Sequence, residues 1–330
     1  MKVLVTGGAG YIGSTIASAL ADQGIEPVIL DNLITGRREF TAGRHFYEGD
    51  IADGALVDQI FAEHSIYTAV HCAALVVVPE SVADPVRYYR ENVSKTVEFT
   101  GHLIRNRCRR LAFSSSVSVY AGDTTEINED SRISPSSPYA QTKAIVETFL
   151  RDIARTGALK VVALRYANPI GNDPKLRTGL QIDAPTHILG RLIGAAEGDG
   201  RFTITGTGWP TRDGSGLRDY IHVWDLAQAH VNLVQRFDSV PLAEGFTVLN
   251  LSSGSGTTVR EMVLAFQTAT KCNLDVAESE TRPGDVAGFC ADNARAVRAL
   301  EWAPKLTISD AINDAMAWRP RRVQMLRTSD

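Results

Sequence analysis

Apolar runs of strand length alternate with amphipathic segments of helix length through the first half of the chain. In the first unit, a β-branched apolar run covers residues 2–6, and apolar positions recur at helical spacing over residues 11–23. The whole alternation predicts strands at residues 2–6, 26–30, 45–48, 67–72, 111–113 and 160–166, and helices at residues 11–23, 55–63, 85–107 and 139–155. This order favours an α/β fold with a Rossmann-type, doubly wound parallel sheet.

The alternation breaks after residue 171. From there the pattern predicts loops at residues 172–182 and 206–216, strands at 217–223 and 248–251, and helices at 186–197, 225–233, 259–270, 293–300 and 308–318. We therefore expect a sheet domain of residues 1–170 plus about 222–251, interleaved with a smaller C-terminal α/β substrate-binding lobe of about 171–221 and 252–318. Residues 319–330 lack an apolar pattern and are predicted to be a frayed tail.

Composition narrows the class of protein. The 330 residues are 44% hydrophobic and 22% charged, as in ordinary soluble proteins, and a net charge of −4 gives no reason to expect nucleic acid or a membrane as partner. The apolar start is too short for a signal sequence, and the longest apolar run, near residues 70–78, is too short to span a bilayer. Four scattered cysteines favour a reducing, cytoplasmic compartment. The seven histidines have no metal-ligand spacing, so no metal is predicted, and His222 in an apolar strand is expected to be structural.

A glycine-rich turn joins the first strand to the first helix. Gly8, Gly10 and Gly13 satisfy G-x-G-x-x-G, and Gly7, Gly10 and Gly13 satisfy the wider G-x-x-G-x-x-G. Such a turn lets backbone N–H groups approach a pyrophosphate at a helix N-terminus. Asp31 ends the next strand, where a carboxylate would hold a ribose diol and favour NAD over NADP. Two alternatives remain: a glycine turn without a ligand, and a 2′-phosphate held by the arginines at positions 37 and 38.

Other polar or small residues stand where predicted strands end. Asp50 is suited to an adenine amine, although a solvated turn aspartate fits equally well. Ala73 and Ala74 are small enough for a cofactor to lie close. The hydroxyls of Ser114 and Ser116 lie where open α/β sheets bind ligands, or merely end a strand.

Tyr139 and Lys143 lie one turn apart on the same face of a predicted helix. A fixed ammonium near a phenol favours the phenolate, so Tyr139 would accept a hydroxyl proton near neutral pH. The spacing also arises by chance. Arg218 and Arg282, from loop-rich segments, would clamp a diphosphate or are ordinary surface arginines.

Longer motifs carry a specific resemblance. The chain resembles the extended short-chain dehydrogenase/reductase family and, within it, the UDP-glucose (UDP-galactose) 4-epimerases. The matching segments run nearly end to end: Val-Thr-Gly-Gly-Ala-Gly-Tyr-Ile-Gly-Ser at 5–14, Asp-Asn-Leu at 31–33, Glu-Gly-Asp-Ile at 48–51, Phe-Ser-Ser-Ser at 113–116, Ser-Pro-Tyr at 137–139 with Lys143, Leu-Arg-Tyr at 164–166, Asn-Pro at 168–169, Pro-Thr at 210–211, Arg-Asp-Tyr-Ile-His-Val at 218–223 and Gly-Asp at 284–285.

The resemblance implies roles for individual residues. It implies Tyr139 as the base, Lys143 as its electrostatic partner and a ribose ligand, and Ser116 as a hydrogen-bonding partner of the sugar O4. The implied NAD-binding residues are Gly7, Gly10, Tyr11, Ile12, Gly13, Asp31, Asn32, Asp50, Ile51, Ala73, Ala74, Asn92, Ser114, Tyr139, Lys143 and Tyr166. The implied residues for a UDP-sugar substrate are Ser116, Tyr139, Asn168, Thr186, Thr203, Thr205, Arg218, Arg282, Asp285 and Phe289. The implied reaction is inversion at C4 through a transient 4-keto sugar, in a protein that is expected to be a homodimer through its 85–107 and 139–155 helices.

Departures from the family pattern bear on the sugar. Val76 replaces a lysine near the cofactor phosphates, Ala167 replaces a phenylalanine, Thr186 stands near a UDP-binding asparagine, and Ala121 replaces a glycine. Phe289 argues against an N-acetyl group, whereas Ala167 would add space. The alternatives are a 4-epimerase of an N-acetylhexosamine, uronic acid or modified sugar, a nucleotide-sugar 4,6-dehydratase, and a non-catalytic NAD-binding regulator. Val117-Ser118 stands where a dehydratase carries Asp-Glu and argues against that class, and a regulator would be expected to lose Tyr139 or Lys143.

Overall fold

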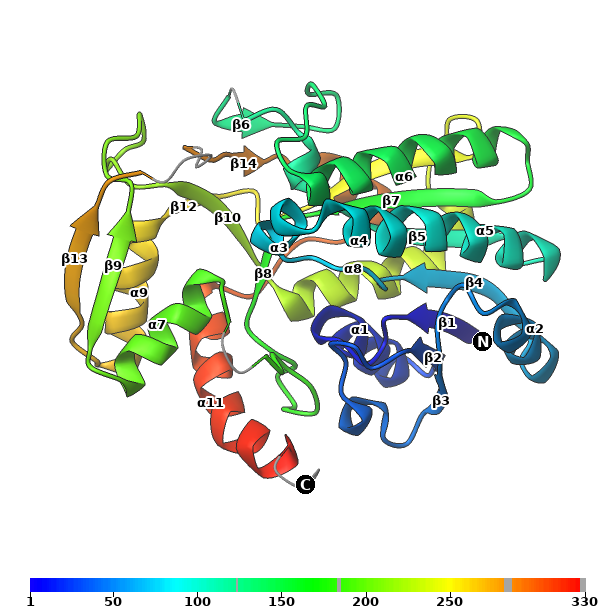
Figure 1. Cartoon of the computed structure of the whole chain (residues 1–330), viewed down its shortest axis with the longest axis horizontal. Coiled ribbons are helices and arrows are strands. Elements are labelled where there is room, and N and C mark those ends of the chain that lie inside the picture. The colour runs from blue at the N-terminus through cyan, green and yellow to red at the C-terminus, as the bar shows by residue number, and fades with distance from the viewer. Residues whose placement is uncertain (123, 183–184, 282–286, 327–330) are drawn as a thin grey trace.

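A seven-stranded parallel sheet forms the centre of the molecule (Figure 1). The computed structural model describes residues 1–122, 124–182, 185–281 and 287–326. The strand order is β11-β7-β5-β4-β1-β2-β3, which confirms the predicted doubly wound sheet. The strands are β1 (Lys2–Thr6), β2 (Glu26–Asp31), β3 (His45–Glu48), β4 (Ile66–His71), β5 (Arg110–Ser116), β7 (Lys160–Tyr166) and β11 (Phe246–Leu251). The chain order reverses between β1 and β4, and ligands bind at such switch points in open α/β sheets.

Helices cover both faces of the sheet, each over its own apolar core. One core contains Ile16 of α1 and Leu226 of α8, and the other contains Val57 of α2, Phe99 of α5 and Leu150 of α6. The helices of this part are α1 (Tyr11–Asp22), α2 (Gly54–Glu63), α3 (Val78–Ala83), α4 (Pro85–Tyr89), α5 (Lys95–Arg105), α6 (Pro138–Arg155), α8 (Val223–Arg236) and α10 (Ala294–Leu300), with short 3₁₀ turns η1 (Arg38–Thr41), η3 (Val117–Val119) and η4 (Phe237–Ser239).

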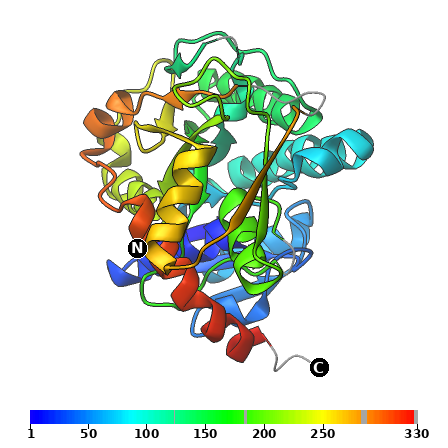
Figure 2. The ribbon, with the colours of Figure 1, turned by 90° about the vertical axis from the view of Figure 1, so that its left-hand side faces the viewer.

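A second group of elements packs at one end of the sheet (Figure 1) and faces the viewer in Figure 2. It has its own apolar core. Ile204, Phe266 and Ile312 bring a strand and two helices into that core. The elements are β8 (Asn168–Ile170), α7 (Ile188–Glu197), β9 (Arg201–Thr205), β10 (Leu217–His222), β12 (Gly256–Thr258), α9 (Val259–Thr270), β13 (Asp275–Ser279) and α11 (Ile308–Leu326), while β6 (Glu126–Ile127) pairs with β14 (Cys290–Ala291). Six strands were not predicted from the sequence, because short or polar strands have little apolar periodicity: β6, β8, β9, β12, β13 and β14.

The expected single helix over residues 85–107 is interrupted. It consists of α4, a π-helical turn η2 (Arg90–Ser94) and α5, and Arg107 already has a left-handed φ of 60°. Asn92 lies in the wide turn and is 3% exposed. π-Turns inside α-helices occur frequently at functional sites.

The expected frayed tail begins inside a helix, and that prediction was wrong for its first part. α11 continues through Pro320 to Leu326, and of the expected tail only residues 327–330 lie outside the described part of the chain. Trp318, just before the expected tail, is 2% exposed, and Arg322 donates through Nη2 to the carbonyl of Gln181 at 3.0 Å. These anchors are single polar bonds, which apolar periodicity does not reveal. Among the described residues, no helix has the length and apolar character needed to cross a membrane.

Candidate active site

The turn between β1 and α1 admits only glycine at two positions. Gly7 has φ of 68°, and a Cβ there would lie 2.7 Å from the backbone nitrogen of Ala73. A Cβ on Gly13 would lie 2.2 Å from the carbonyl oxygen of Gly7. The first turn of α1, with Ile12 in it, therefore packs directly on the glycine turn, and its backbone N–H groups stand at the carboxyl end of the strands.

Asp31 closes the edge of this turn. Its Oδ2 accepts from the Ala9 N–H at 2.9 Å, and its Oδ1 accepts from the Leu33 N–H at 2.8 Å. The side chain is buried, and burial raises its pKa although both N–H groups act in the opposite direction. Each carboxylate oxygen keeps a further lone pair for a hydroxyl donor.

Asp50 is an ion-paired residue here, not a solvated turn aspartate. Lys95 Nζ lies 2.6 Å from its Oδ2, and Asn32 Nδ2 lies 3.5 Å from the same atom. Burial acts to raise the pKa of Asp50, but Lys95 and the Ala52 N–H outweigh it, so the pKa falls below its usual value. Ile51 beside it is 7% exposed. Lys95 was not predicted as a site residue, because the sequence around one lysine on an amphipathic helix does not indicate which carboxylate it will contact.

The Asn92 side chain supports the segment that follows β4. Its Oδ1 accepts from the Leu75 N–H at 2.8 Å, and its Nδ2 donates to the Leu75 carbonyl at 2.9 Å and to Thr142 Oγ1 at 3.2 Å. The bonds fix the backbone just beyond Ala73 and Ala74 and tie it to α6. The buried asparagine thus has the partners that its position demands.

Tyr139, Lys143 and Ser116 meet at the carboxyl end of β5. Ser137 caps α6 by accepting from the Ala140 N–H, so Tyr139 and Lys143 occupy its first two turns. Lys143 Nζ lies 6.0 Å from the centre of the Tyr139 ring and donates to the Ser114 carbonyl at 2.7 Å. Ser116 Oγ accepts from the N–H and the Oγ of Ser118, at 3.1 and 2.8 Å. A hydrogen bond between the Ser116 and Tyr139 side chains acts to lower the pKa of Tyr139.

The protonation of this pair differs from the sequence expectation. Burial raises the pKa of Tyr139 to about 12, and the hydrogen bond from Ser116 only partly offsets it. Burial lowers the pKa of Lys143 to about 8, against the opposing effects of Cys72 and Glu147. Lys143 is therefore cationic at neutral pH, but its ammonium is bonded to a carbonyl and does not by itself give a neutral-pH phenolate.

A buried polar chain lies behind Lys143. Ser114 Oγ lies 2.7 Å from the Tyr166 hydroxyl, which lies 2.7 Å from His230 Nε2, and His230 Nδ1 lies 2.9 Å from the Leu226 carbonyl. Burial lowers the pKa of His230 to about 4, so the ring is neutral and Tyr166 donates to Nε2. The side chains of Ser114 and Tyr166, both expected to hold the cofactor, are bonded to each other.

An ion pair lies one turn below Lys143 in α6. Arg165 Nη2 lies 2.5 Å from Glu147 Oε2, and both residues are at least 96% buried. Ser115 Oγ also donates to Glu147 at 2.5 Å. This pair joins α6 to β7 and β5 under the catalytic residues, and neither member was identified from the sequence.

The expected substrate residues lie on several elements. Asn168 on β8 donates to the Asp219 carbonyl at 2.9 Å, and Arg218 on β10 donates to the Ala287 carbonyl at 3.3 Å. Phe289 packs against the apolar cluster that contains Val117 and Val119, the residues just after Ser116 in the chain. Thr203 and Thr205 share the face of β9 opposite the buried Phe202 and Ile204, and Thr186 is exposed before α7. Arg282 and Asp285 lie outside the described residues.

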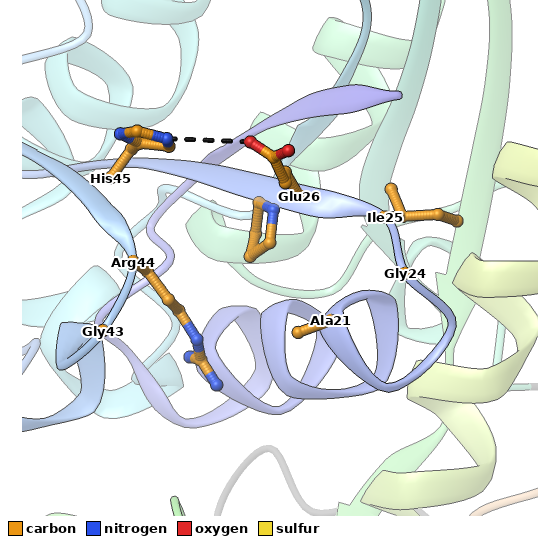
Figure 3. A pocket seen from close by; sticks show the side chains of 8 residues that line it. Ala21, Gly24, Ile25, Glu26, Gly43, Arg44 and His45 are labelled. Carbon is orange, nitrogen blue, oxygen red and sulfur yellow. Dashed lines mark ion pairs between the residues drawn. The ribbon is translucent and has the colours of Figure 1, made fainter.

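A separate hollow of about 540 Å³ lies away from these residues (Figure 3). Glu26 and His45 stand on its wall, at the amino ends of β2 and β3. Arg44, also on the wall, is occupied with the Phe40 carbonyl and the Ser18 hydroxyl. The hollow is at the opposite end of the strands from Tyr139 and is not part of the candidate site. Among the described residues, no cluster of side chains has the composition of a metal site.

The model of the NAD dependent epimerase/dehydratase family matches residues 3–248. The chain belongs to this family. The match covers the glycine turn, Asp31, Ser116, Tyr139 and Lys143, which the fold brings to one edge of the sheet.

Relatives within the family extend over the whole chain. The UDP-glucose 4-epimerase of Rhizobium leguminosarum bv. trifolii is 39% identical over 98% of both chains, and that of Bacillus subtilis (strain 168) is 36% identical over 100% of both. Among solved structures, the UDP-glucose-4-epimerase from Stenotrophomonas maltophila with bound NAD and formylated UDP-arabinopyranose has a TM-score of 0.93, at 33% identity over 100% of both chains. The second group of elements is therefore shared as well as the sheet.

Proposed function

We propose that the protein is an NAD-dependent UDP-hexose 4-epimerase, an isomerase that interconverts UDP-glucose and UDP-galactose. The observation that carries the proposal is the meeting of Tyr139, Lys143 and Ser116 beside the glycine turn, at the switch point of the sheet. Full-length similarity to UDP-glucose 4-epimerases supports the choice of reaction.

The glycine turn at residues 7–13 and the carboxylate of Asp31 are suited to bind a dinucleotide. Side chains at Gly7 or Gly13 would collide with the backbone of Ala73 and of Gly7, so the glycines keep the turn tight, and Asp31 retains acceptor capacity for ribose hydroxyls. We assign the NAD contacts to this turn with Tyr11, Ile12, Asn32, Asp50, Ile51, Ala73, Ala74, Asn92, Ser114, Tyr139, Lys143 and Tyr166. Bound NAD supplies a positively charged acceptor and later donor for the hydride at C4 of the sugar, so that a 4-keto sugar is formed only transiently.

Tyr139 would accept the proton of the sugar O4 hydroxyl. Ser116 would hydrogen-bond the same oxygen by turning its hydroxyl from Tyr139 to the sugar, while Ser118 continues to satisfy its acceptor side. Lys143 supplies fixed positive charge on the same helix face. After the hexose turns within the pocket, Tyr139 returns the proton, while Asn168, Thr186, Thr203, Thr205, Arg218, Arg282 and Asp285 are proposed to hold the nucleotide.

The charge of Lys143 should be visible in the pH profile. Lys143→Met is expected to lower kcat about tenfold or more below pH 8, because it removes the cation that favours the Tyr139 phenolate. The difference from wild type should shrink above pH 8, since Lys143 itself loses its charge as the pH passes its pKa of about 8. The measurement is kcat against pH at saturating NAD. Lys160→Met, which removes a surface ammonium paired with Asp238, is the control and should leave the profile unchanged. A profile for Lys143→Met that coincides with wild type would contradict this role.

Phe289 is expected to limit the size of the sugar. Its ring packs against the apolar cluster that contains Val117 and Val119, so Phe289→Ser opens space near the chain segment that begins at Ser116. The variant should gain about 10-fold or more in kcat/KM for UDP-N-acetylgalactosamine relative to UDP-galactose. Phe289→Leu keeps most of the apolar volume and serves as the control. Equal selectivity in wild type and Phe289→Ser would remove Phe289 as the determinant.

The reaction itself is tested with no added cofactor. The protein is incubated with UDP-galactose, UDP-N-acetylgalactosamine or UDP-galacturonate, and the products are separated. UDP-glucose as the main product is expected. Inversion of only another sugar would replace the substrate, and absence of any C4-inverted product would refute the epimerase. A 4,6-dehydratase would release a keto sugar, and Val117 and Ser118 offer no carboxylate for that elimination.

The proposed assembly is a homodimer. Val82, Val86 and Val97 are exposed apolar residues of α3, α4 and α5, and Val86 is 79% exposed. α4 and α5 both contact α6, so one apolar helical face is available to a second copy. Sedimentation equilibrium should give twice the chain mass for wild type and the chain mass for Val86→Asp; a wild-type monomer would refute the dimer.

The two groups of elements are proposed to bind different ligands. We propose that residues 1–170 with about 222–251 hold NAD, and that about 171–221 with 252–318 hold the nucleotide sugar. The described cysteines are all free thiols, which supports the proposed cytoplasmic location. Thiol titration of protein from its native host would contradict this location if it found stable disulfides.

A further inference from the structure

Residues 171–182, here called the strap, connect the two sides of the cofactor turn. At its start, the Gly171 carbonyl accepts from the Tyr11 hydroxyl at 2.5 Å, and Tyr11 is the first residue of α1. At its end, Gln181 Nε2 donates to the Thr35 carbonyl at 2.7 Å, in the loop that follows Asp31. The strap therefore reaches from the helix N-terminus above the glycines to the loop beside the ribose-binding carboxylate.

Ion pairs fasten the middle of the strap to the far end of α1. Asp22 accepts from Lys175 Nζ at 3.0 Å and from Arg177 Nη1 at 2.7 Å. Arg177 Nε also lies 2.5 Å from Asp173, whose side chain is fully buried. The hydrogen bond from Arg177, opposed by burial and aided by Lys175, lowers the pKa of Asp22. Lys175 and Arg177 thus fix the strap along the whole length of the helix that begins at the cofactor turn.

α11 holds the strap from its outer side. Trp318 Nε1 donates to the Leu180 carbonyl at 2.9 Å, and Arg322 Nη2 donates to the Gln181 carbonyl at 3.0 Å. A Cβ on Gly179 would lie 2.6 Å from Trp318 Cε2, so the strap and the indole are in close contact. The same indole lies 5.9 Å from the Phe40 ring, centre to centre, which joins α11 to the sheet domain.

We infer that the strap, which Trp318 and Arg322 of α11 hold in place, slows the dissociation of NAD from its site. The inference rests on the proposed function insofar as NAD is the ligand. A dinucleotide held by the glycine turn and Asp31 would lie beside Tyr11 and Thr35, the two points that the strap ties together. Its departure then requires release of the strap, and release requires the contacts to α11 to break. Retention suits a reaction without net redox, since an exchanged cofactor contributes nothing to turnover.

The two α11 contacts provide the test. Arg322→Ala removes the donor to Gln181, and Trp318→Phe removes the donor to Leu180 while keeping a ring against Phe40. Arg321→Ala is the matched control, because it makes the same chemical change at the neighbouring, exposed position, whose described hydrogen bond stays within the helix to Gln324. Each protein is loaded with isotope-labelled NAD and chased with unlabelled NAD, and the bound label is followed by native mass spectrometry.

The expected result is dissociation about five- to tenfold faster in Arg322→Ala and in Trp318→Phe, as for loss of one hydrogen bond, and unchanged in Arg321→Ala. kcat at saturating NAD should stay at the wild-type value in Arg322→Ala, which separates retention from general damage. Equal dissociation rates in all four proteins would overturn the inference. Failure of wild type to bind NAD at all would instead refute the proposed function, and it is measured first.

Discussion

Tyr139→Phe is expected to lower kcat by about a thousandfold, within the range that removal of a positioned acid–base group produces. The substitution deletes one oxygen atom and keeps the ring that faces Lys143 at 6.0 Å. KM for UDP-galactose should change little, since the nucleotide is held by other residues. Initial-rate kinetics with UDP-galactose give both constants.

The matched control is Tyr67→Phe. Tyr67 lies near the amino end of β4, away from the carboxyl ends of the strands where Tyr139 lies, and it is 64% exposed. It should retain wild-type kcat. Bound NAD in Tyr139→Phe should equal that in wild type, so that any loss belongs to the proton transfer. A fall in kcat of less than about tenfold would exclude Tyr139 as the proton acceptor.

Arg165→Met is expected to lower the free energy of unfolding by about 3–5 kcal/mol, because it leaves the buried carboxylate of Glu147 without its cation. Burial disfavours the charge on Arg165, yet Glu147 outweighs this effect and keeps the guanidinium pKa above its ordinary value. Urea denaturation of the NAD-free proteins measures the change.

The control is Arg155→Met at the end of the same helix, where the side chain is 53% exposed and pairs with Glu244. Its loss should leave the free energy of unfolding nearly unchanged, because exposed ion pairs contribute little to stability. The double variant Glu147→Met/Arg165→Met should be more stable than Arg165→Met alone, since no unpaired charge remains. A double variant that is less stable than the single variant would contradict this explanation, because removing the unpaired carboxylate would then bring no gain in stability.

The sheet could be predicted from the sequence because its signal is local. Apolar runs such as that of β7 predicted the strand at residues 160–166 to the residue, and the Tyr139–Lys143 spacing placed both side chains on one helix face. β9 and β13 were missed because they pair with each other across some seventy residues and present polar side chains on one side.

The parts of the site that could not be predicted depend on pairing between distant segments. Lys95 meets Asp50 only because β4 and β1 are neighbours in the sheet. Arg165 meets Glu147 only after α6 has packed on β7. The protonation of Tyr139 was also misjudged. Spacing shows that a cation is near, but the effect of burial, which raises the pKa to about 12, depends on the complete packing.

The π-turn at Asn92 explains how residues spaced four apart can all remain buried on the same side of the helix. Tyr88, Asn92, Thr96 and Thr100 follow one another at steps of four, and all are at most 3% exposed. On a regular α-helix each such step moves the buried line by about 40°, so three steps would carry it about 120° around the axis. The π-turn takes up part of this rotation and keeps Tyr88 facing Val77 while Thr96 still faces His71. A line of buried residues that advances in steps of four along a helix can therefore mark the place where the helix widens to turn a polar side chain inward.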